Sequence, residues 1–165
     1  MNGSALITGS AKRIGKEIAL GLASQGTNIV VHYMNSQKAA QDVVDQAKLF
    51  GVRAECIKAD LLIDSEVKNL IVKASSLIGA PLNILVNNAS IFEYDNIENA
   101  SLESWDRHIG SNLKAPLFLM QEFSKQICEE KNDSNGENIP TGNIVNIVDQ
   151  RVLKKTPEFF TYSLA

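Results

Sequence analysis

The stretch Thr8-Gly9-Ser10-Ala11-Lys12-Arg13-Ile14-Gly15 connects an apolar run, residues 5–8, to a segment of helical periodicity, residues 13–25. Its glycines and small side chains allow the backbone to approach a ligand closely. The first turn of a helix adds free N–H groups and the positive end of its dipole. In the first strand–loop–helix unit of a doubly wound fold, this combination is typical of a dinucleotide phosphate site. An ordinary turn between strand and helix is the alternative.

From this loop onward, short β-branched runs alternate with longer segments of helical period, which indicates a parallel sheet covered by helices. We predict a single α/β domain over residues 1–165, with a doubly wound, Rossmann-type parallel sheet. The predicted strands are residues 5–8, 28–33, 53–58, 83–86 and 142–148. The predicted helices are residues 13–25, 37–50, 65–78 and 101–130, and a further helix begins within residues 159–165.

Local signals predict how these helices begin and end. Ser36 can cap the second helix, and Ser65 or Asp64 the third. Glycines at positions 26, 51 and 79 end the first three helices. Pro116 should kink or break the long fourth helix. We expect its apolar face at Leu113, Leu117, Met120, Phe123 and Ile127, and a surface loop over residues 130–141.

Composition excludes several classes of protein. The 165 residues carry 16 Lys and Arg against 19 Asp and Glu, a formal charge of −3, without blocks of one sign. We therefore expect neither a nucleic-acid partner nor a membrane partner. Cys56 and Cys128, both predicted to lie in buried strand or helix, lack the spacing of a metal site or a disulfide scaffold. The sequence shows no secretory signal, so we expect a cytoplasmic protein.

The end of the second strand indicates which cofactor the loop binds. Sites selective for NAD carry an Asp or Glu about 20 residues after the glycine loop. This chain has His32-Tyr33-Met34-Asn35-Ser36 there, without a carboxylate to repel a 2′-phosphate. Lys12 and Arg13 add positive charge, and Asn35 and Ser36 can donate hydrogen bonds to phosphate. We therefore predict NADPH, with solvated surface cations and a plain turn as the alternative.

With these features the chain resembles the short-chain dehydrogenase/reductases and, within them, the pteridine reductases. The loop Thr8–Gly15 matches the family's glycine loop, with Arg13 replacing the middle glycine as in pteridine reductases. Asn87-Asn88-Ala89 and Asn112 match two further family elements. Tyr162 matches the tyrosine of the family's Tyr-x-x-x-Lys pair, whose lysine would be residue 166. The resemblance implies an oxidoreductase.

The resemblance also implies roles for individual residues. Tyr162 is the expected proton donor, and Asp149 lies where the general family has a catalytic Ser and pteridine reductases have Asp (162 − 13 = 149). Asn112 is expected to hold a water that links the lysine to solvent, or to be only a backbone hydrogen-bond partner. The expected substrate-binding residues are Arg13, Ser90, Phe92, Asp149 and Tyr162, with Phe92 stacking on the pterin. The loop, the strand ends and the resemblance together place cofactor contacts at Gly9, Lys12, Arg13, Ile14, Gly15, Tyr33, Asn35, Ser36, Asp60, Leu61, Asn88, Ala89 and Ser90.

The chemistry of these residue types supports the same roles. Hydride transfer to a C=N or C=O bond leaves negative charge on the substrate, so the site needs a proton donor. A free tyrosine, with a pKa near 10, suits this role only beside a cation. A carboxylate at a strand end, such as Asp149, can pair with the N–H groups of a pterin, although it can also cap the next turn. Three other residues also have purely structural alternatives. Asp60 can be a helix cap, Tyr162 a residue packed at the start of a helix, and Phe92 a core residue.

The predicted function is an NADPH-dependent reductase of a dihydropteridine or dihydrofolate, with no metal. The alternatives are another carbonyl reductase of the family, such as a 3-oxoacyl thioester reductase, and a nucleotide-binding module without catalysis. By resemblance we expect a homotetramer. The family's remaining helix and strands do not follow Tyr162, so we expect the chain to be part of a longer enzyme, the alternative being a truncated, inactive product.

Overall fold

A computed structural model describes residues 3–127, 131–132, 134–154 and 156–165. Its main sheet has five parallel strands in the order β3-β2-β1-β4-β7. The predicted doubly wound α/β fold is therefore confirmed. The strands are β1 (Ser4–Ile7), β2 (Asn28–Tyr33), β3 (Ala54–Lys58), β4 (Ile84–Asn87) and β7 (Asn143–Asn146).

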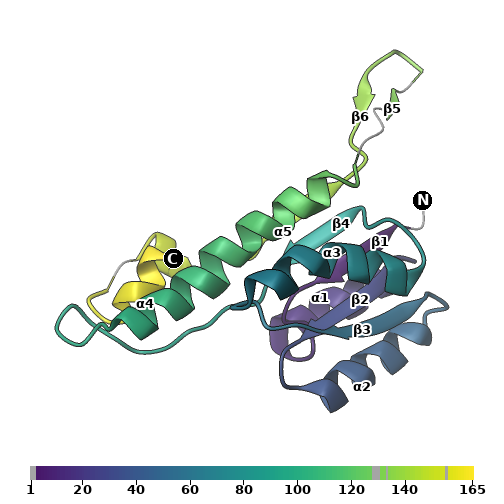
Figure 1. Ribbon diagram of the computed structural model, residues 1–165. Helices are drawn as coiled ribbons and strands as arrows, with labels where there is room; N and C mark the ends of the chain where they lie inside the picture. The colour runs from purple at the N-terminus through teal and green to yellow at the C-terminus, as the bar shows by residue number, and fades with distance from the viewer. Residues whose placement is uncertain (1–2, 128–130, 133, 155) are drawn as a thin grey trace.

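Helices cover both faces of this sheet (Figure 1). One face packs against α1 (Arg13–Ser24) and α2 (Gln37–Lys48), and the other against α3 (Asp64–Ile78) and α5 (Ala115–Ser124). Side chains alternate between the two faces along a strand. In β1, Ala5 and Ile7 accordingly join the core on the α1 side, while Leu6 joins the core on the α3 side.

The order of the strands locates the binding crevice. The chain proceeds from β1 outward to β2 and β3, then crosses back to β4 and β7 on the other side of β1. In open α/β sheets, ligands bind beyond the carboxyl ends of the strands where the order reverses. That point lies between the loops that follow β1 and β4.

The predicted long helix is divided into three parts. These are α4 (Leu102–His108), a π-helix over Ile109–Lys114, and α5. Pro116 lies in the first turn of α5, where its missing N–H and its ring disturb the preceding turn, in agreement with the predicted break.

The buried face of this divided helix differs in part from the prediction. Phe123 is buried as expected, and it packs with Ala115 and Leu119. Leu113 and Leu117, however, are 50% and 55% exposed. The helix carries apolar residues on two sides, and the sequence pattern alone does not distinguish the side that faces the sheet.

The glycines predicted to end helices adopt the expected backbone conformation, whereas the predicted N-terminal caps do not form. Gly26, Gly51 and Gly79 all have positive φ. However, neither α2 nor α3 has a side-chain hydrogen bond at its N-cap, so the predicted capping by Ser36, and by Ser65 or Asp64, was wrong. The second helix also ends at Lys48, two residues earlier than predicted.

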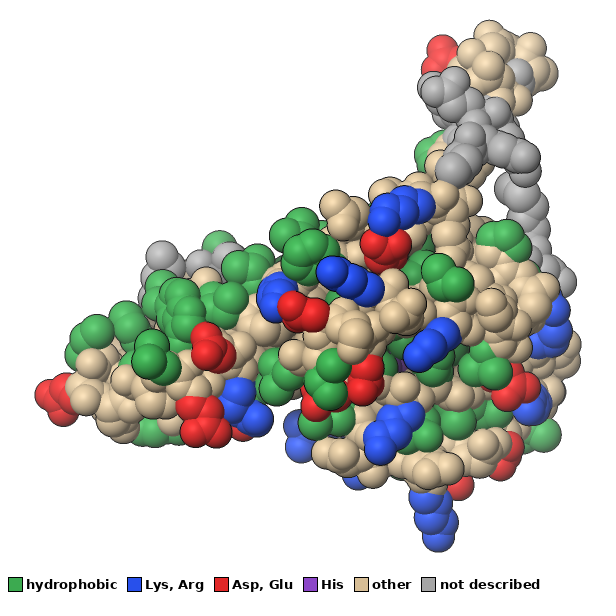
Figure 2. All heavy atoms as spheres, viewed as in Figure 1, with side chains coloured by type: hydrophobic (Ala, Val, Ile, Leu, Met, Phe, Trp, Pro, Cys, Tyr) green, Lys and Arg blue, Asp and Glu red, His purple; other side chains and the backbone are tan. Residues whose placement is uncertain are grey.

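The segment after α5 contains a small antiparallel pair of strands, β5 (Lys131–Asn132) and β6 (Asn138–Ile139), where a loop was predicted. Cys128, predicted in a buried element, lies outside the described residues. The helix predicted within residues 159–165 is α6 (Phe160–Leu164), which contacts α4. Hydrophobic side chains are exposed on the lobe that contains these two helices (Figure 2).

None of the helices in the described ranges has both the length and the apolar character needed to cross a bilayer. Within the same ranges, no cluster of three or more His, Cys, Asp or Glu side chains is arranged to hold a metal ion.

Candidate active site

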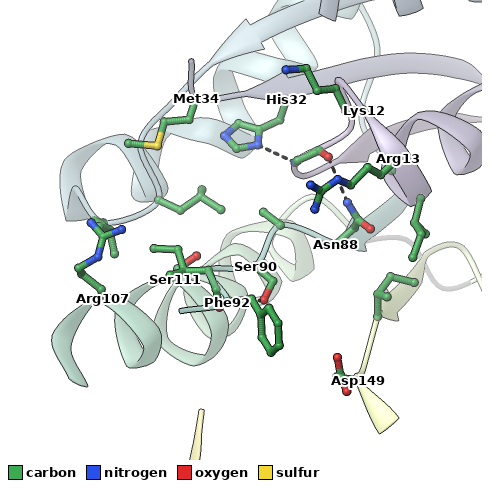
Figure 3. Close-up of a pocket in the computed structure, with 18 of the residues that line it drawn as sticks. Lys12, Arg13, His32, Met34, Asn88, Ser90, Phe92, Arg107, Ser111 and Asp149 are labelled. Carbon is green, nitrogen blue, oxygen red and sulfur yellow. Dashed lines mark hydrogen bonds between the residues drawn. The ribbon is translucent and has the colours of Figure 1, made fainter. Parts of the chain in front are cut away.

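A cleft of about 690 Å³ opens at the carboxyl edge of the sheet, at the predicted crevice (Figure 3). The segments that follow β1, β2, β3, β4 and β7 all contribute to its walls, together with α4, the π-helix and α6. His32 and Met34 lie at one end, and Ser90, Phe92 and Asp149 at the other. The predicted site residues that line the cleft are Gly9, Lys12, Arg13, Ile14, Gly15, Asp60, Leu61, Asn88, Ala89, Ser90, Phe92, Asp149 and Tyr162.

The loop after β1 has the geometry of a phosphate site. Gly9 adopts φ +62°, and a Cβ on it would lie 2.9 Å from Ala89 Cα. A Cβ on Gly15 would lie 2.5 Å from Asn88 Nδ2 and 2.6 Å from Gly9 O. No side chain caps the start of α1 at Lys12, so the N–H groups of its first turn remain available to an anion.

Arg13 has a backbone conformation that usually requires glycine. Its φ is +52°, in the left-handed region, at the position where the family's glycine loop has its middle glycine. For a residue with a Cβ this conformation costs about 1–2 kcal/mol. The substitution therefore adds a cation to the wall of the cleft at the expense of backbone strain.

Hydrogen bonds join the ends of β1 and β4 beneath this loop. Asn88 Nδ2 donates to Thr8 O at 2.9 Å and to Gly9 O at 3.2 Å. The Thr8 hydroxyl oxygen accepts from the N–H groups of Asn88 (2.9 Å) and Ala89 (3.0 Å). These contacts fix the two loops between which a dinucleotide would lie.

His32 is a site residue that the sequence analysis did not identify. It is 2% exposed, and its Nδ1 accepts a hydrogen bond from Gly9 N–H at 3.0 Å. Its Nε2 therefore carries the proton and donates to Ala59 O at 3.1 Å. Burial lowers the pKa of His32 to about 4. A histidine among β-branched residues was the available signal, but which face it occupies depends on the strand.

The end of β2 contributes different residues from those predicted. Tyr33 is 9% exposed and packs in the core between the sheet and α1 and α2. Tyr33, Asn35 and Ser36 are not among the residues that line the cleft, whereas Met34 is. Asp60 does line it, and its Oδ1 accepts from Leu62 N–H at 2.9 Å, as a turn-capping Asp would.

Tyr162, Asp149 and Ser90 meet at the other end of the cleft. Burial raises the pKa of the Tyr162 phenol, and the charge and hydrogen bonding of the Asp149 carboxylate raise it further. The nearby Ser90 hydroxyl, which donates to Ile91 O at 3.2 Å, and the charge of Arg151 act in the opposite direction. The phenol thus keeps its proton at neutral pH. Among the described residues the stronger charge acting on it is the Asp149 carboxylate, not the cation that the sequence analysis expected, so its pKa lies above and not below its ordinary value. Asp149 also caps the following turn, because its Oδ1 accepts from Arg151 N–H at 2.8 Å.

Phe92 lies beside this polar group. Its ring stacks on Phe159, with centroids 4.2 Å apart and an interplanar angle of 8°. Its edge contact with Tyr162 has a centroid separation of 4.8 Å. Phe92 is 51% exposed and lines the cleft. The alternative interpretation, in which Phe92 is an ordinary residue of the hydrophobic core, is therefore wrong.

Asn112 has a backbone-binding role in the structure. It lies in the π-helix and is not among the residues that line the cleft. Its Oδ1 accepts from Ile91 N–H and its Nδ2 donates to Ile91 O, both at 2.9 Å. Asn112 therefore holds the segment that leads to Phe92, and its predicted catalytic role stays a prediction.

A sequence model of the short chain dehydrogenase family matches residues 4–165. The chain belongs to this family of oxidoreductases. A 3-oxoacyl-[acyl-carrier-protein] reductase FabG from Staphylococcus epidermidis is 36% identical over 131 residues, which is 79% of this chain and 53% of the relative. A short-chain type dehydrogenase/reductase from Picea abies is 33% identical over 167 residues, covering 96% of this chain and 58% of the relative.

Among solved structures, a similar one is FolM alternative dihydrofolate reductase 1 from Brucella canis, complexed with NADP. It superposes with a TM-score of 0.87 and 37% identity, over 99% of this chain and 62% of that one. The Brucella suis FolM complex with NADP gives a TM-score of 0.87 and 36% identity, over 98% of this chain and 63% of that one. The present chain thus spans between half and two thirds of the length of these relatives.

Proposed function

We propose that the protein is an NADPH-dependent reductase of a dihydropteridine or dihydrofolate, with Tyr162 as the proton donor. The meeting of Tyr162, Asp149 and Ser90 at one end of the cleft carries this proposal. The FolM structures, which are solved with NADP, support it through their identity with this chain.

The residues around the cleft fit a dinucleotide phosphate. The free N–H groups at the start of α1 would hold the pyrophosphate. Gly9 and Gly15 let the loop pack closely on Ala89 and Asn88, which fixes the position of these N–H groups. Lys12 and Arg13 add positive charge on the same wall, and none of the described lining residues at the end of β2 is a carboxylate. Both features favour NADPH over NADH. When bound, this cofactor supplies the hydride.

The residues at the other end supply the proton. Tyr162 holds it on the phenolic oxygen at neutral pH and can pass it to the substrate nitrogen or oxygen that becomes negative during reduction. Asp149 places a carboxylate where the N–H groups of a pterin can bind it. Phe92 offers an aromatic surface for a flat ring at the same end.

One assay separates this proposal from its main alternative. The purified protein is given NADPH with a dihydropteridine, or with an acetoacetyl thioester, and NADPH absorbance is followed. We expect oxidation with the dihydropteridine, and loss of at least 100-fold in kcat for Tyr162→Phe. Turnover of the thioester alone would contradict the proposal and favour the FabG-like reaction, which the 36% identity supports.

Asp149→Asn is the matched variant for substrate choice. The amide oxygen can still accept from Arg151 N–H, so the turn after β7 keeps its cap while the negative charge is lost. We expect a KM for the dihydropteridine raised about tenfold and an unchanged affinity for NADPH. An unchanged KM would remove Asp149 from substrate binding.

We also propose a homotetramer. Hydrophobic side chains are exposed along α4, the π-helix and the first turn of α5, among them Leu102 (84%), Leu113 and Leu117, and they support association through this surface. Light scattering on the purified protein tests the stoichiometry. A monodisperse monomer would contradict the proposal.

A further inference from the structure

Three side chains from distant parts of the chain form a buried network next to the proposed proton donor. Asp95 comes from the segment between β4 and α4, His108 from the end of α4, and Thr161 from α6. They are 3%, 0% and 2% exposed. None of them lines the cleft, and the proposed chemistry does not use them.

The hydrogen bonds fix the direction of each donor in this network. His108 Nε2 accepts from Glu93 N–H at 3.1 Å, so the proton of the neutral ring is on Nδ1. Nδ1–H then donates to the Thr161 hydroxyl oxygen at 2.7 Å. The Thr161 hydroxyl donates in turn to Asp95 Oδ2. Each polar atom therefore has a defined partner.

Asp95 accepts the remaining hydrogen bonds of this network. Its Oδ1 accepts from Thr161 N–H at 3.0 Å, and its Oδ2 also accepts from the Ser104 hydroxyl at 2.8 Å. Its backbone oxygen accepts from Phe160 N–H at 3.3 Å. Burial alone would raise the pKa of Asp95, but the hydrogen bonds from Thr161 and Ser104 lower it below its usual value. Asp95 is thus an ionised acceptor at neutral pH.

Helix α6 depends on these contacts for its position. Its first turn is joined to the segment after β4, because the N–H groups of Phe160 and Thr161 both donate to Asp95. The chain enters it through Phe159, which has φ +58° and so a strained left-handed backbone. Tyr162 follows Thr161 directly, and its ring meets the His108 ring nearly edge-on, with centroids 5.9 Å apart.

We infer that Asp95, Thr161 and His108 are positioning residues that hold the Tyr162 phenol against Asp149 and Ser90. They act through the first turn of α6, and none of them touches the proposed substrate. This inference rests on the proposed function for its effect on catalysis. The orientation of Tyr162, however, can be measured without any substrate.

The decisive substitution is Thr161→Val, which removes the hydroxyl at nearly constant volume, with Thr161→Ser as the matched control that keeps it. Tyr162 titration is followed by NMR on protein labelled at the tyrosine ring carbons, and Tyr162→Phe assigns the resonance. In wild type and in Thr161→Ser we expect the phenol to titrate above its ordinary value. In Thr161→Val we expect it to titrate nearer pH 10, because the ring leaves Asp149 and its partly buried position.

Kinetics supply the second readout. A displacement of about 1 Å in a reacting group can cost about 100-fold in rate. We therefore expect kcat for Thr161→Val to fall about 100-fold while the KM for NADPH stays within about twofold, and Thr161→Ser to recover most of the rate. A purely structural role would lower thermal stability without this division between kcat and KM.

Asp95→Asn is the second variant, in case Thr161→Val does not fold. Its amide oxygen still accepts from Thr161 N–H, while its NH₂ group cannot accept from the hydroxyls of Thr161 and Ser104. An unmoved Tyr162 titration in the folded variants overturns the inference, even if the protein reduces a dihydropteridine. A moved titration supports the inference even if no dihydropteridine is reduced, which separates its failure from that of the proposed function.

Discussion

The buried imidazole of His32 makes a strong prediction about stability in acid. Its pKa is lowered from 6.5 to about 4 by burial, and its two nitrogens are committed to Gly9 N–H and Ala59 O. Between these two pH values the unfolded chain binds a proton that the folded chain excludes. The free energy of unfolding must therefore fall as the pH falls from about 6.5 towards 4, and the loss is complete below pH 4.

The magnitude follows from the two pKa values. Each pKa unit corresponds to about 1.4 kcal/mol, so the full difference is worth about 3 kcal/mol. Little of this is lost at pH 7.5, and about 2 kcal/mol is lost by pH 5. The side chain is only 2% exposed, so solvent screening does not reduce this value appreciably.

His32→Gln supplies the comparison. The variant lacks the titrating ring, and all other ionisable groups are shared with the wild type. Leaving Gly9 N–H without its acceptor should cost about 1–3 kcal/mol at pH 7.5. As the pH falls to 5, the wild type should lose about 2 kcal/mol more than the variant, so the two stabilities converge.

Urea unfolding, followed by the fluorescence of the single tryptophan, measures both proteins at pH 7.5, 6.5, 5.5 and 5.0. Parallel pH profiles for the two proteins would refute the reasoning. So would an NMR titration in which the His32 ring gains its proton near pH 6.5.

The remaining predictions concern the loop after β1 and the π-helix. Arg13→Gly should raise the free energy of unfolding by up to about 1 kcal/mol, because relief of the left-handed backbone is partly offset by the greater entropy of glycine in the unfolded chain. It should also weaken NADPH binding about tenfold through loss of the cation. Urea unfolding and calorimetric titration check these two effects, and a less stable variant would contradict the strain. Gly15→Ala should cost about 1–3 kcal/mol and displace the loop, because the new Cβ meets Asn88 and backbone atoms at under 3 Å; an unchanged melting temperature with normal NADPH binding would contradict it. Asn112→Ala should cost about 2 kcal/mol because it leaves Ile91 N–H without its acceptor and removes one of the two donors to Ile91 O, which keeps only the Ser90 hydroxyl. Asn112→Asp, which can still accept from Ile91 N–H, should cost less. Equal stabilities of the two Asn112 variants, measured by thermal unfolding, would show that the bond from Ile91 N–H contributes nothing.

The sequence by itself determined the layers of the fold and the place of the cleft. Strand and helix periods are local properties, and Gly26 and Gly79 end their helices whatever packs around them. Parallel strands joined by helices also have their carboxyl ends at one edge, so the loops at Gly9 and Asn88 had to face the same crevice. Arg13 could be assigned to this loop for the same reason.

Only the tertiary structure decided which side chains enter that crevice. Along β2 and beyond it, a shift of one residue moves a side chain to the other face, and so His32 and Met34 line the cleft while Tyr33 is buried in the core. The face that α5 turns to the sheet depends likewise on packing against α3. The network that joins Asp95, His108 and Thr161 depends on contacts among three segments that lie apart in the sequence. A local sequence pattern cannot predict contacts between distant segments.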